Sequence, residues 1–129
     1  MIVSQEKPVC WDRLEKEFGV KWVPGLYVTY NAQIHSPSGE IETEYLVHEL
    51  VHVAQQQGKD PEAHLEKYIA DPKYRLSCEL PAYKVQVAFL RATVDNPDEL
   101  FTRMHKIWKA MANSYKGMVT YEEAKQFLS

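Results

Sequence analysis

The first regular pattern along the chain is an alternation of apolar and polar side chains over residues 26–34. Every second position is apolar, and the set comprises Leu26, Val28, Tyr30, Ala32 and Ile34. Successive side chains of a strand point to opposite faces of a sheet, so this spacing predicts one half-buried strand over residues 26–34. The following Ser36-Pro37-Ser38-Gly39 predicts a turn.

The pattern changes to a helical period at about Thr43. Apolar residues then recur three and four positions apart, and the set comprises Leu46, Val47, Leu50, Val51, Val53 and Ala54. This predicts a mostly buried helix from about Thr43 to Gln57, with one polar edge that faces a cleft. Gly58 is placed to end it.

Five further helices are predicted from their start and stop signals. A first begins at Pro8 and ends at Gly19. The others begin at a capping residue followed by proline, or at a capping box: Asp60-Pro61, Asp71-Pro72, Asn96-Pro97 and Thr120-Tyr121-Glu122-Glu123. Pro81 falls inside the helix that begins at Asp71, so that helix either kinks there or gives way to a new one near Leu80.

Together these elements predict a mostly helical α+β fold, with a small β-sheet or hairpin before the helix at residues 43–57. A length of 129 residues suffices for one domain with its own core and is too short for two. The chain contains no repeat, low-complexity tract or linker. We therefore expect residues 1–129 to form a single domain.

Charge and composition narrow the possible partners and compartments. A net charge of −3 argues against nucleic acid or a membrane surface as a main partner, because either usually needs a basic face. Residues 1–7 lack the apolar segment of a secretion signal, and no apolar run approaches membrane-spanning length. Cys10 and Cys78 lack a C-x-x-C partner and do not make a disulfide framework. We therefore expect a cytoplasmic protein with two buried thiols.

His48, Glu49 and His52 spell H-E-x-x-H within the helix at residues 43–57. Residues four apart lie one turn apart on a helix, so the two imidazoles can bind one metal ion. Glu49 lies about 100° around the helix axis, at the rim of the same face, where a carboxylate can activate water. The alternative is two ordinary helix histidines beside a glutamate.

A catalytic zinc site has three protein ligands and an open position for water, so a third ligand is expected downstream. The candidates are Glu62, His64, Glu66, Asp71 and Glu79. Glu79 stands out because Tyr83 follows one turn later, which gives a carboxylate for a metal and a phenol for an oxyanion on one side of a helix. Arg75, one turn before Glu79, either pairs with it and orients it or is solvated. Gln55 and Gln56 are expected to line the cleft.

The motif H-E-L-x-H-x-x-Q-Q over residues 48–56, with the later E-x-x-A-Y over residues 79–83, resembles minimal gluzincin-type zinc metallopeptidases, including small phage and prophage proteins. Residues 10–14, 25–30 and 71–76 are also similar to segments of those proteins, so the resemblance covers most of residues 8–90. Metzincins are excluded, because Gln55 and Gly58 stand where that family has glycine and histidine. Pro81 departs from the helix-compatible residue expected in the second motif.

The resemblance implies a zincin-like hydrolase in which His48, His52 and Glu79 bind Zn²⁺, Glu49 is the general base, and Tyr83 helps to stabilise the oxyanion. It implies a peptide or protein substrate, and the cytoplasm of a bacterial host if the protein is phage-encoded. An extended substrate can add to a free edge of the strand at residues 26–34. If both edges are packed, the strand serves only as scaffold.

Two other functions stay open. The first is a non-catalytic phage or bacterial assembly or interaction protein, in which zinc stabilises a small fold. The second is a metal-assisted hydrolase that acts on a non-peptide amide. Glu49 favours catalysis over the first, because a structural site has no use for a general base beside its ligands.

Overall fold

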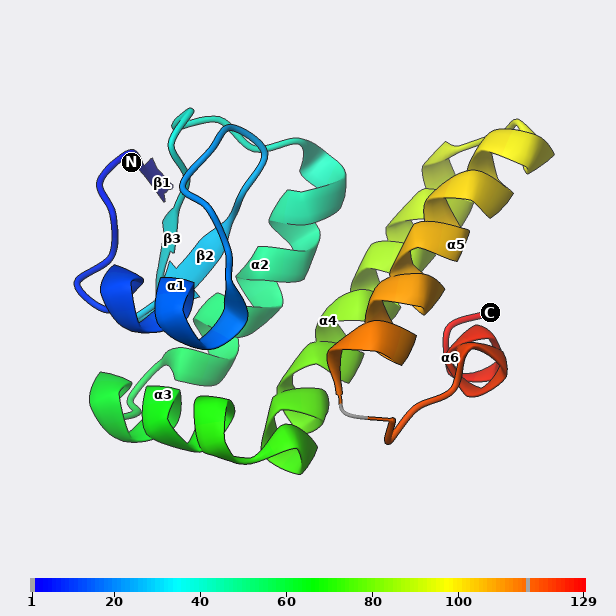
Figure 1. Ribbon diagram of the computed structural model, residues 1–129. Helices are drawn as coiled ribbons and strands as arrows, with labels where there is room; N and C mark the ends of the chain where they lie inside the picture. The colour runs from blue at the N-terminus through cyan, green and yellow to red at the C-terminus, as the bar shows by residue number, and fades with distance from the viewer. Residues whose placement is uncertain (1, 116) are drawn as a thin grey trace.

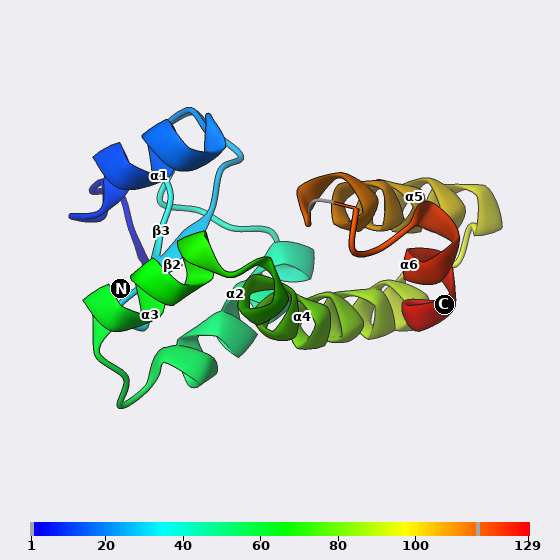
Figure 2. The same cartoon turned by 60° about the horizontal axis from the view of Figure 1, so that its bottom comes forward.

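The computed structural model describes residues 2–115 and 117–129, and its fold is α+β and mostly helical, as predicted (Figure 1). The elements are β1 (Val3–Ser4), α1 (Trp11–Phe18), β2 (Val28–Tyr30), β3 (Gln33–His35), α2 (Thr43–Gln56), α3 (Pro61–Ala70), α4 (Pro72–Thr93), α5 (Pro97–Ser114) and α6 (Tyr121–Phe127). The sheet, α1 and α2 lie at one end of the molecule and α5 and α6 at the other, with α4 extending between them (Figures 1 and 2). Among the described helices, none is long and apolar enough to cross a membrane.

The prediction of one strand over residues 26–34 was wrong, because this segment is a hairpin. β2 pairs antiparallel with β3, Tyr30 lies opposite Gln33, and β1 pairs parallel with the far side of β3. The two residues between the strands, Asn31 and Ala32, both have positive φ, at 52° and 58°. A two-residue turn of this kind usually contains glycine. Because this turn contains none, the alternation of apolar and polar residues over 26–34 was interpreted as one continuous strand.

The hairpin changes which side chains share a face of the sheet. Residues opposite each other point to the same side, so Ile34 shares a face with Thr29. That face is turned toward α2, because the Thr29 hydroxyl donates a hydrogen bond to Glu49 on α2. Val28 and Tyr30 point the other way and pack against the buried residues of α1. Both faces of this small sheet are therefore covered by helices.

The predicted helix starts are confirmed at their caps. Asp60, Asp71 and Asn96 each accept a backbone hydrogen bond from the first turn of the following helix. Thr120 and Glu123 exchange the two hydrogen bonds of a capping box. α1 begins at Trp11 instead of Pro8, after a turn in which the Pro8 carbonyl accepts the Trp11 N–H.

Pro81 does not divide α4. The helix runs without interruption from Pro72 to Thr93, so the alternative of a new helix near Leu80 was wrong. Pro81 lies on the exposed side of α4, where the carbonyl that loses its intrahelical partner can be hydrated. Glu79 and Tyr83 therefore lie one turn apart on a continuous helix.

The buried apolar residues form two separate clusters. The C-terminal cluster joins the second half of α4 to α5 and α6 and comprises Val87, Leu90, Met104, Ile107, Trp108, Met111, Tyr115, Val119, Ala124 and Leu128. The N-terminal cluster is smaller and is built on Cys10, Trp11 and Leu14. Between them, most buried residues of α2 and of the first half of α4 are polar or charged: Glu44, His48, Glu49, His52, Arg75 and Glu79.

Candidate metal centre

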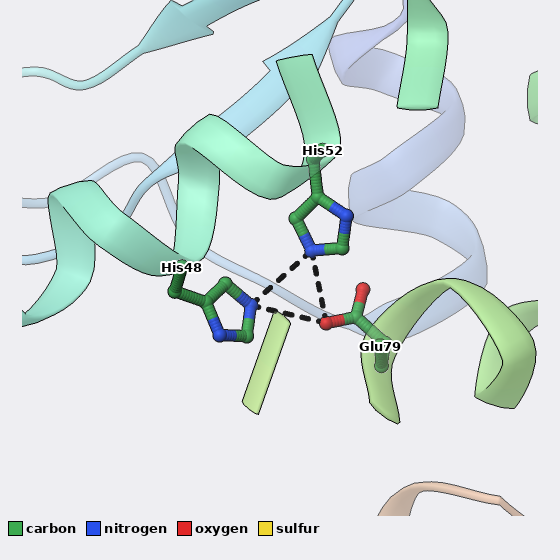
Figure 3. Close-up of side chains that lie close together, drawn as sticks. All are labelled: His48, His52 and Glu79. Atoms are coloured by element: carbon green, nitrogen blue, oxygen red, sulfur yellow. Dashed lines mark hydrogen bonds and ion pairs between the residues drawn. The ribbon is translucent and has the colours of Figure 1, made fainter. Parts of the chain in front are cut away.

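His48 and His52 project from one face of α2 toward a common point (Figure 3). The helix places them one turn apart, and their Nε2 atoms are 3.2 Å from each other. Both residues are buried, at 8% and 7% exposure. The expectation that the two imidazoles can share one metal ion thus agrees with their geometry.

Glu79 reaches the same point from α4, which packs against α2 (Figure 3). Its Oε1 lies 3.1 Å from the Nε2 atom of each histidine. Ligand atoms about 2.0–2.1 Å from a tetrahedral zinc ion are separated from one another by about 3.3 Å. The three atoms are therefore spaced almost as one zinc ion requires, and His48, His52 and Glu79 form a buried group that can hold a metal ion.

Gln55 fixes the orientation of His52. Its Nε2 donates to the Cys78 carbonyl at 2.9 Å, which turns its Oε1 toward His52 Nδ1 at 3.0 Å. His52 then donates from Nδ1, and the lone pair of Nε2 is left for a metal ion. The corresponding Nδ1 of His48 is buried, and it has no hydrogen-bond partner among the described residues.

Tyr68 on α3 orients Glu79, a role that the sequence did not indicate. Its hydroxyl donates to Glu79 Oε2 at 2.6 Å, so Oε1 is the oxygen that faces the imidazoles. Tyr68 precedes Glu79 by eleven residues and belongs to another helix. No local spacing relates two residues in that arrangement, and only the packing of α3 against α4 brings them together.

Glu79 and His52 shift each other's pKa in opposite directions. Burial alone would raise the pKa of the Glu79 carboxyl, but hydrogen bonds from His48 and His52 hold that pKa well below its usual range. Burial lowers the pKa of His52, and the hydrogen bond and charge of Glu79 outweigh it and raise that pKa to about 9. At neutral pH the metal-free site is therefore an ion pair between His52 and Glu79, and a metal ion must displace its proton.

Glu49 stands beside the three ligand atoms without being one of them. Its Oε2 is 3.7 Å from His48 Nε2, and its Oε1 accepts the Thr29 hydroxyl hydrogen bond at 3.2 Å. Burial raises the pKa of the Glu49 carboxyl, and the positive charge of the neighbouring histidines opposes this effect. A carboxylate with a raised pKa next to a metal site is suited to accept a proton.

Tyr83 lies against His48, one turn after Glu79. The two rings meet edge to face, with their centroids 4.6 Å apart. Burial, together with the charges of Glu79 and Glu49, keeps the pKa of the Tyr83 phenol well above its usual value, so the hydroxyl stays protonated. Within the described residues that hydroxyl has no hydrogen-bond partner, so it is available to a ligand in the cleft.

A cleft with two lobes opens on this group. One lobe, of about 360 Å³, is lined by His48, His52 and Glu79 and by apolar and aromatic side chains from α1, the segment at residues 26–30 and α3. The second, of about 440 Å³, continues past His48, Glu49 and Tyr83 toward the charged residues Glu44, Arg103 and Lys106. The candidate metal centre therefore lies where an apolar lobe meets a charged one.

β2 borders the cleft as an edge strand, since β3 is its only neighbour in the sheet among residues 2–115 and 117–129. The Thr29 carbonyl on its outer side accepts a hydrogen bond from Gln56 at 3.1 Å, and Gln56 also accepts from the Ala32 N–H. Gln56 thus occupies part of the edge, and none of the described strands covers the rest. The alternative in which both strand edges are packed does not hold for the described chain.

The other candidate ligands lie elsewhere. The structure places Asp71 as the cap of α4, Glu66 in an ion pair with Arg13, and Glu62 on the exposed side of α3. His64 shares the cleft but binds the Tyr74 hydroxyl at 2.7 Å. Both expectations for Arg75 were wrong, because it is buried and donates to two carbonyls at the end of α3 instead of pairing with Glu79.

Comparison of the chain with protein-family models, with curated proteins and with solved structures gave no match. The fold and its side chains define an α+β, mostly helical protein with a buried His-His-Glu group that can hold a metal ion, beside a fourth polar group, Glu49, in an open cleft.

Proposed function

We propose that the protein is a zinc-dependent metallopeptidase that hydrolyses peptide bonds. The observation that carries this proposal is the position of Glu49, a buried carboxylate directly beside a three-ligand group and not part of it. A metal site that only stabilises a fold is usually closed by four protein ligands. This group offers three, and it borders an open cleft.

His48, His52 and Glu79 would hold the metal ion, and two nitrogens with one carboxylate oxygen are a donor set typical of catalytic zinc. When bound, zinc supplies Lewis acidity, which lowers the pKa of water and polarises a peptide carbonyl. Gln55 and Tyr68 keep His52 and Glu79 in the orientation that this binding needs.

The remaining polar side chains of the site would transfer a proton and stabilise the negative charge that forms on the substrate. Glu49 is placed to accept the proton of the attacking water and to pass it to the leaving amine. The Thr29 hydroxyl binds one Glu49 oxygen and leaves the other directed at the cleft. Tyr83, whose ring lies against His48, can donate its hydroxyl hydrogen to the oxyanion that forms at the carbonyl.

The substrate we propose is an extended peptide. It would lie along the free edge of β2 and form backbone hydrogen bonds there, as a further strand of the sheet. Its side chains would then fall into the apolar lobe on one side of the metal centre and the charged lobe on the other. Gln56 bonds to the edge now and would have to release the Thr29 carbonyl.

Replacing Glu49 with glutamine tests this function. The Glu49→Gln protein should bind zinc with unchanged stoichiometry and unfold at a similar denaturant concentration, because no ligand is lost. Hydrolysis of a peptide library, followed by mass spectrometry, should fall about 10²–10⁴-fold. Thr43→Ser, at the start of the same helix, serves as the matched control. Equal hydrolysis by the Glu49→Gln and parent proteins would refute the proposal.

A non-catalytic role for the metal is the second candidate, and one observation favours it. The three ligand candidates join α2 to α4 in the region between the two apolar clusters, where few apolar side chains hold the helices together. A metal ion there would cross-link the two ends of the molecule. On this alternative the Glu49→Gln protein keeps full biological activity, and zinc removal abolishes folding instead of hydrolysis alone.

A further inference from the structure

Arg75 is a buried cation that has no carboxylate partner among the residues the structure describes. It lies on α4 one turn before Glu79 and is 6% exposed. Arg13 and Arg103, by contrast, are much more exposed, and each is paired with a glutamate. Transferring a charge out of water is costly unless it is paired, so the position of Arg75 needs an explanation.

The surroundings of Arg75 satisfy only part of its hydrogen-bonding capacity. Nη1 donates to the carbonyls of Tyr68 and Ile69 at 2.9 and 3.2 Å, at the end of α3. The guanidinium carbon also lies 5.3 Å from the ring centre of Phe18 and 5.8 Å from that of Tyr68. Nε is buried without any partner in the described residues, and none of them accepts from Nη2. Three of the five N–H groups of an arginine therefore remain unused.

The same side chain borders the apolar lobe of the cleft, together with the three ligand candidates. Tyr68 connects the two sites, because its ring lies against the guanidinium and its hydroxyl binds Glu79. Leu14, Phe18 and Leu65 line the same lobe and make its surface largely apolar. An anion beside Arg75 would thus be one aromatic ring away from the candidate metal centre, in a surrounding that strengthens electrostatic attraction.

We infer that Arg75 binds a carboxylate of the substrate in the apolar lobe. The unused N–H groups on Nε and Nη2 are the two that form a fork with both oxygens of a carboxylate. The carboxylate is either the C-terminus of a peptide or the side chain of an acidic residue close to the cleaved bond. This inference deepens the proposed peptidase function and rests on it, since it defines which peptides the cleft accepts.

Peptide binding tests the inference independently of hydrolysis. Two libraries of acetylated random tetrapeptides, one with free C-termini and one with C-terminal amides, are mixed in equal amounts with zinc-treated Glu49→Gln protein. The retained peptides are separated by gel filtration and identified by mass spectrometry. We expect roughly tenfold or greater enrichment of carboxylate-bearing peptides, the size of one charge-assisted hydrogen-bond pair. Enrichment of free acids indicates a C-terminus, and enrichment of amides that contain Asp or Glu indicates a side chain.

Arg75→Lys separates recognition from the structural role of Arg75 at the end of α3. Lysine keeps the positive charge and a donor for the carbonyls, and it lacks the fork that matches a carboxylate. The enrichment should disappear in Arg75→Lys and persist in Arg91→Lys, the same change at an exposed position on the same helix. Retention that does not depend on whether a peptide carries a carboxylate, retention of no peptide, or a preference that survives Arg75→Lys would overturn the inference. If the parent protein hydrolyses no peptide but the enrichment is observed, the result would count against the peptidase function and leave the carboxylate site in place.

Discussion

The two ends of α4 are buried in opposite ways. Its second half contributes Val87 and Leu90 to the C-terminal cluster, where the interior is apolar. Its first half contributes Arg75 and Glu79 to an interior shared with α2, which is mostly polar. Burying apolar surface stabilises a fold, whereas burying charged groups costs free energy unless they are paired. The C-terminal half therefore contributes most of the stability, and part of that stability offsets the cost of burying the polar and charged residues around α2.

The largest effect on stability is therefore expected in the C-terminal cluster. Leu90→Ala removes a fully buried side chain and should lower the free energy of unfolding by about 2–5 kcal/mol. Leu50→Ala is the matched control, since Leu50 is 46% exposed on α2 and should cost less than about 1 kcal/mol. Urea denaturation of both variants measures the difference. Similar losses would contradict the proposed division between the two regions.

Glu79→Ala should have the next largest effect, on metal affinity. It removes one of three ligand candidates and leaves His48 and His52 alone at the site, so zinc affinity should fall about 100-fold or more. Competition with a chromogenic chelator measures the affinity. Glu62→Ala, which removes an exposed glutamate of α3 that the sequence also offered as a ligand, should leave it unchanged. Undiminished affinity in Glu79→Ala would exclude this ligand set.

The features that could be predicted from the sequence are those set by residues close together in the chain, and the features that could not are set by contacts between distant elements. His48 and His52 were paired correctly because the rotation per residue of a helix fixes their relation, and the capping residues likewise fixed where α3 to α6 begin. Glu79 was selected by a motif, and the structure brings it to the same point. The fold class was confirmed for the same reason, since each helix carries its own signals.

The residues that the sequence did not reveal depend on contacts between elements. Tyr68 takes its role from how α3 packs against α4, which no spacing encodes. Gln55 was expected only to line the cleft, and its role depends on the Cys78 carbonyl of α4, which turns the Gln55 side chain so that its oxygen faces His52. The segment at residues 26–34 was predicted as one strand because Asn31 and Ala32 form the hairpin turn without the glycine that normally marks one. Arg75 was expected at the surface or beside Glu79, and only the position of α3 explains its burial.

Gln55→Ala tests one of these contacts between elements and should have a smaller effect. Without Gln55, His52 Nδ1 loses its acceptor, so the tautomer with a free Nε2 is no longer favoured. Zinc affinity should fall about 10–100-fold, as for other residues that orient metal ligands. Gln57→Ala, an exposed neighbour just beyond the helix, should have no effect in the same chelator competition. An unchanged affinity in Gln55→Ala would mean that the helix alone orients His52.

The last prediction needs no substitution and concerns the pH dependence of the stability of the metal-free protein. The pKa of His52 is raised from 6.5 to about 9, so its contribution to stability is complete below pH 6.5 and is lost as the pH rises toward 9. The pKa of Glu79 is lowered from 4.5, so its contribution is present above pH 4.5 and is lost in more acidic solution. Urea midpoints of chelator-treated protein should therefore decline from pH 6.5 to 9, and Glu79→Ala should flatten this decline. Zinc affinity should change in the opposite sense and increase over the same interval, because the metal ion competes with the His52 proton. A urea midpoint that stays constant from pH 6.5 to 9 would show that the polar region contains no His52–Glu79 ion pair, and the contrast between the two ends of α4 would then lose its electrostatic basis.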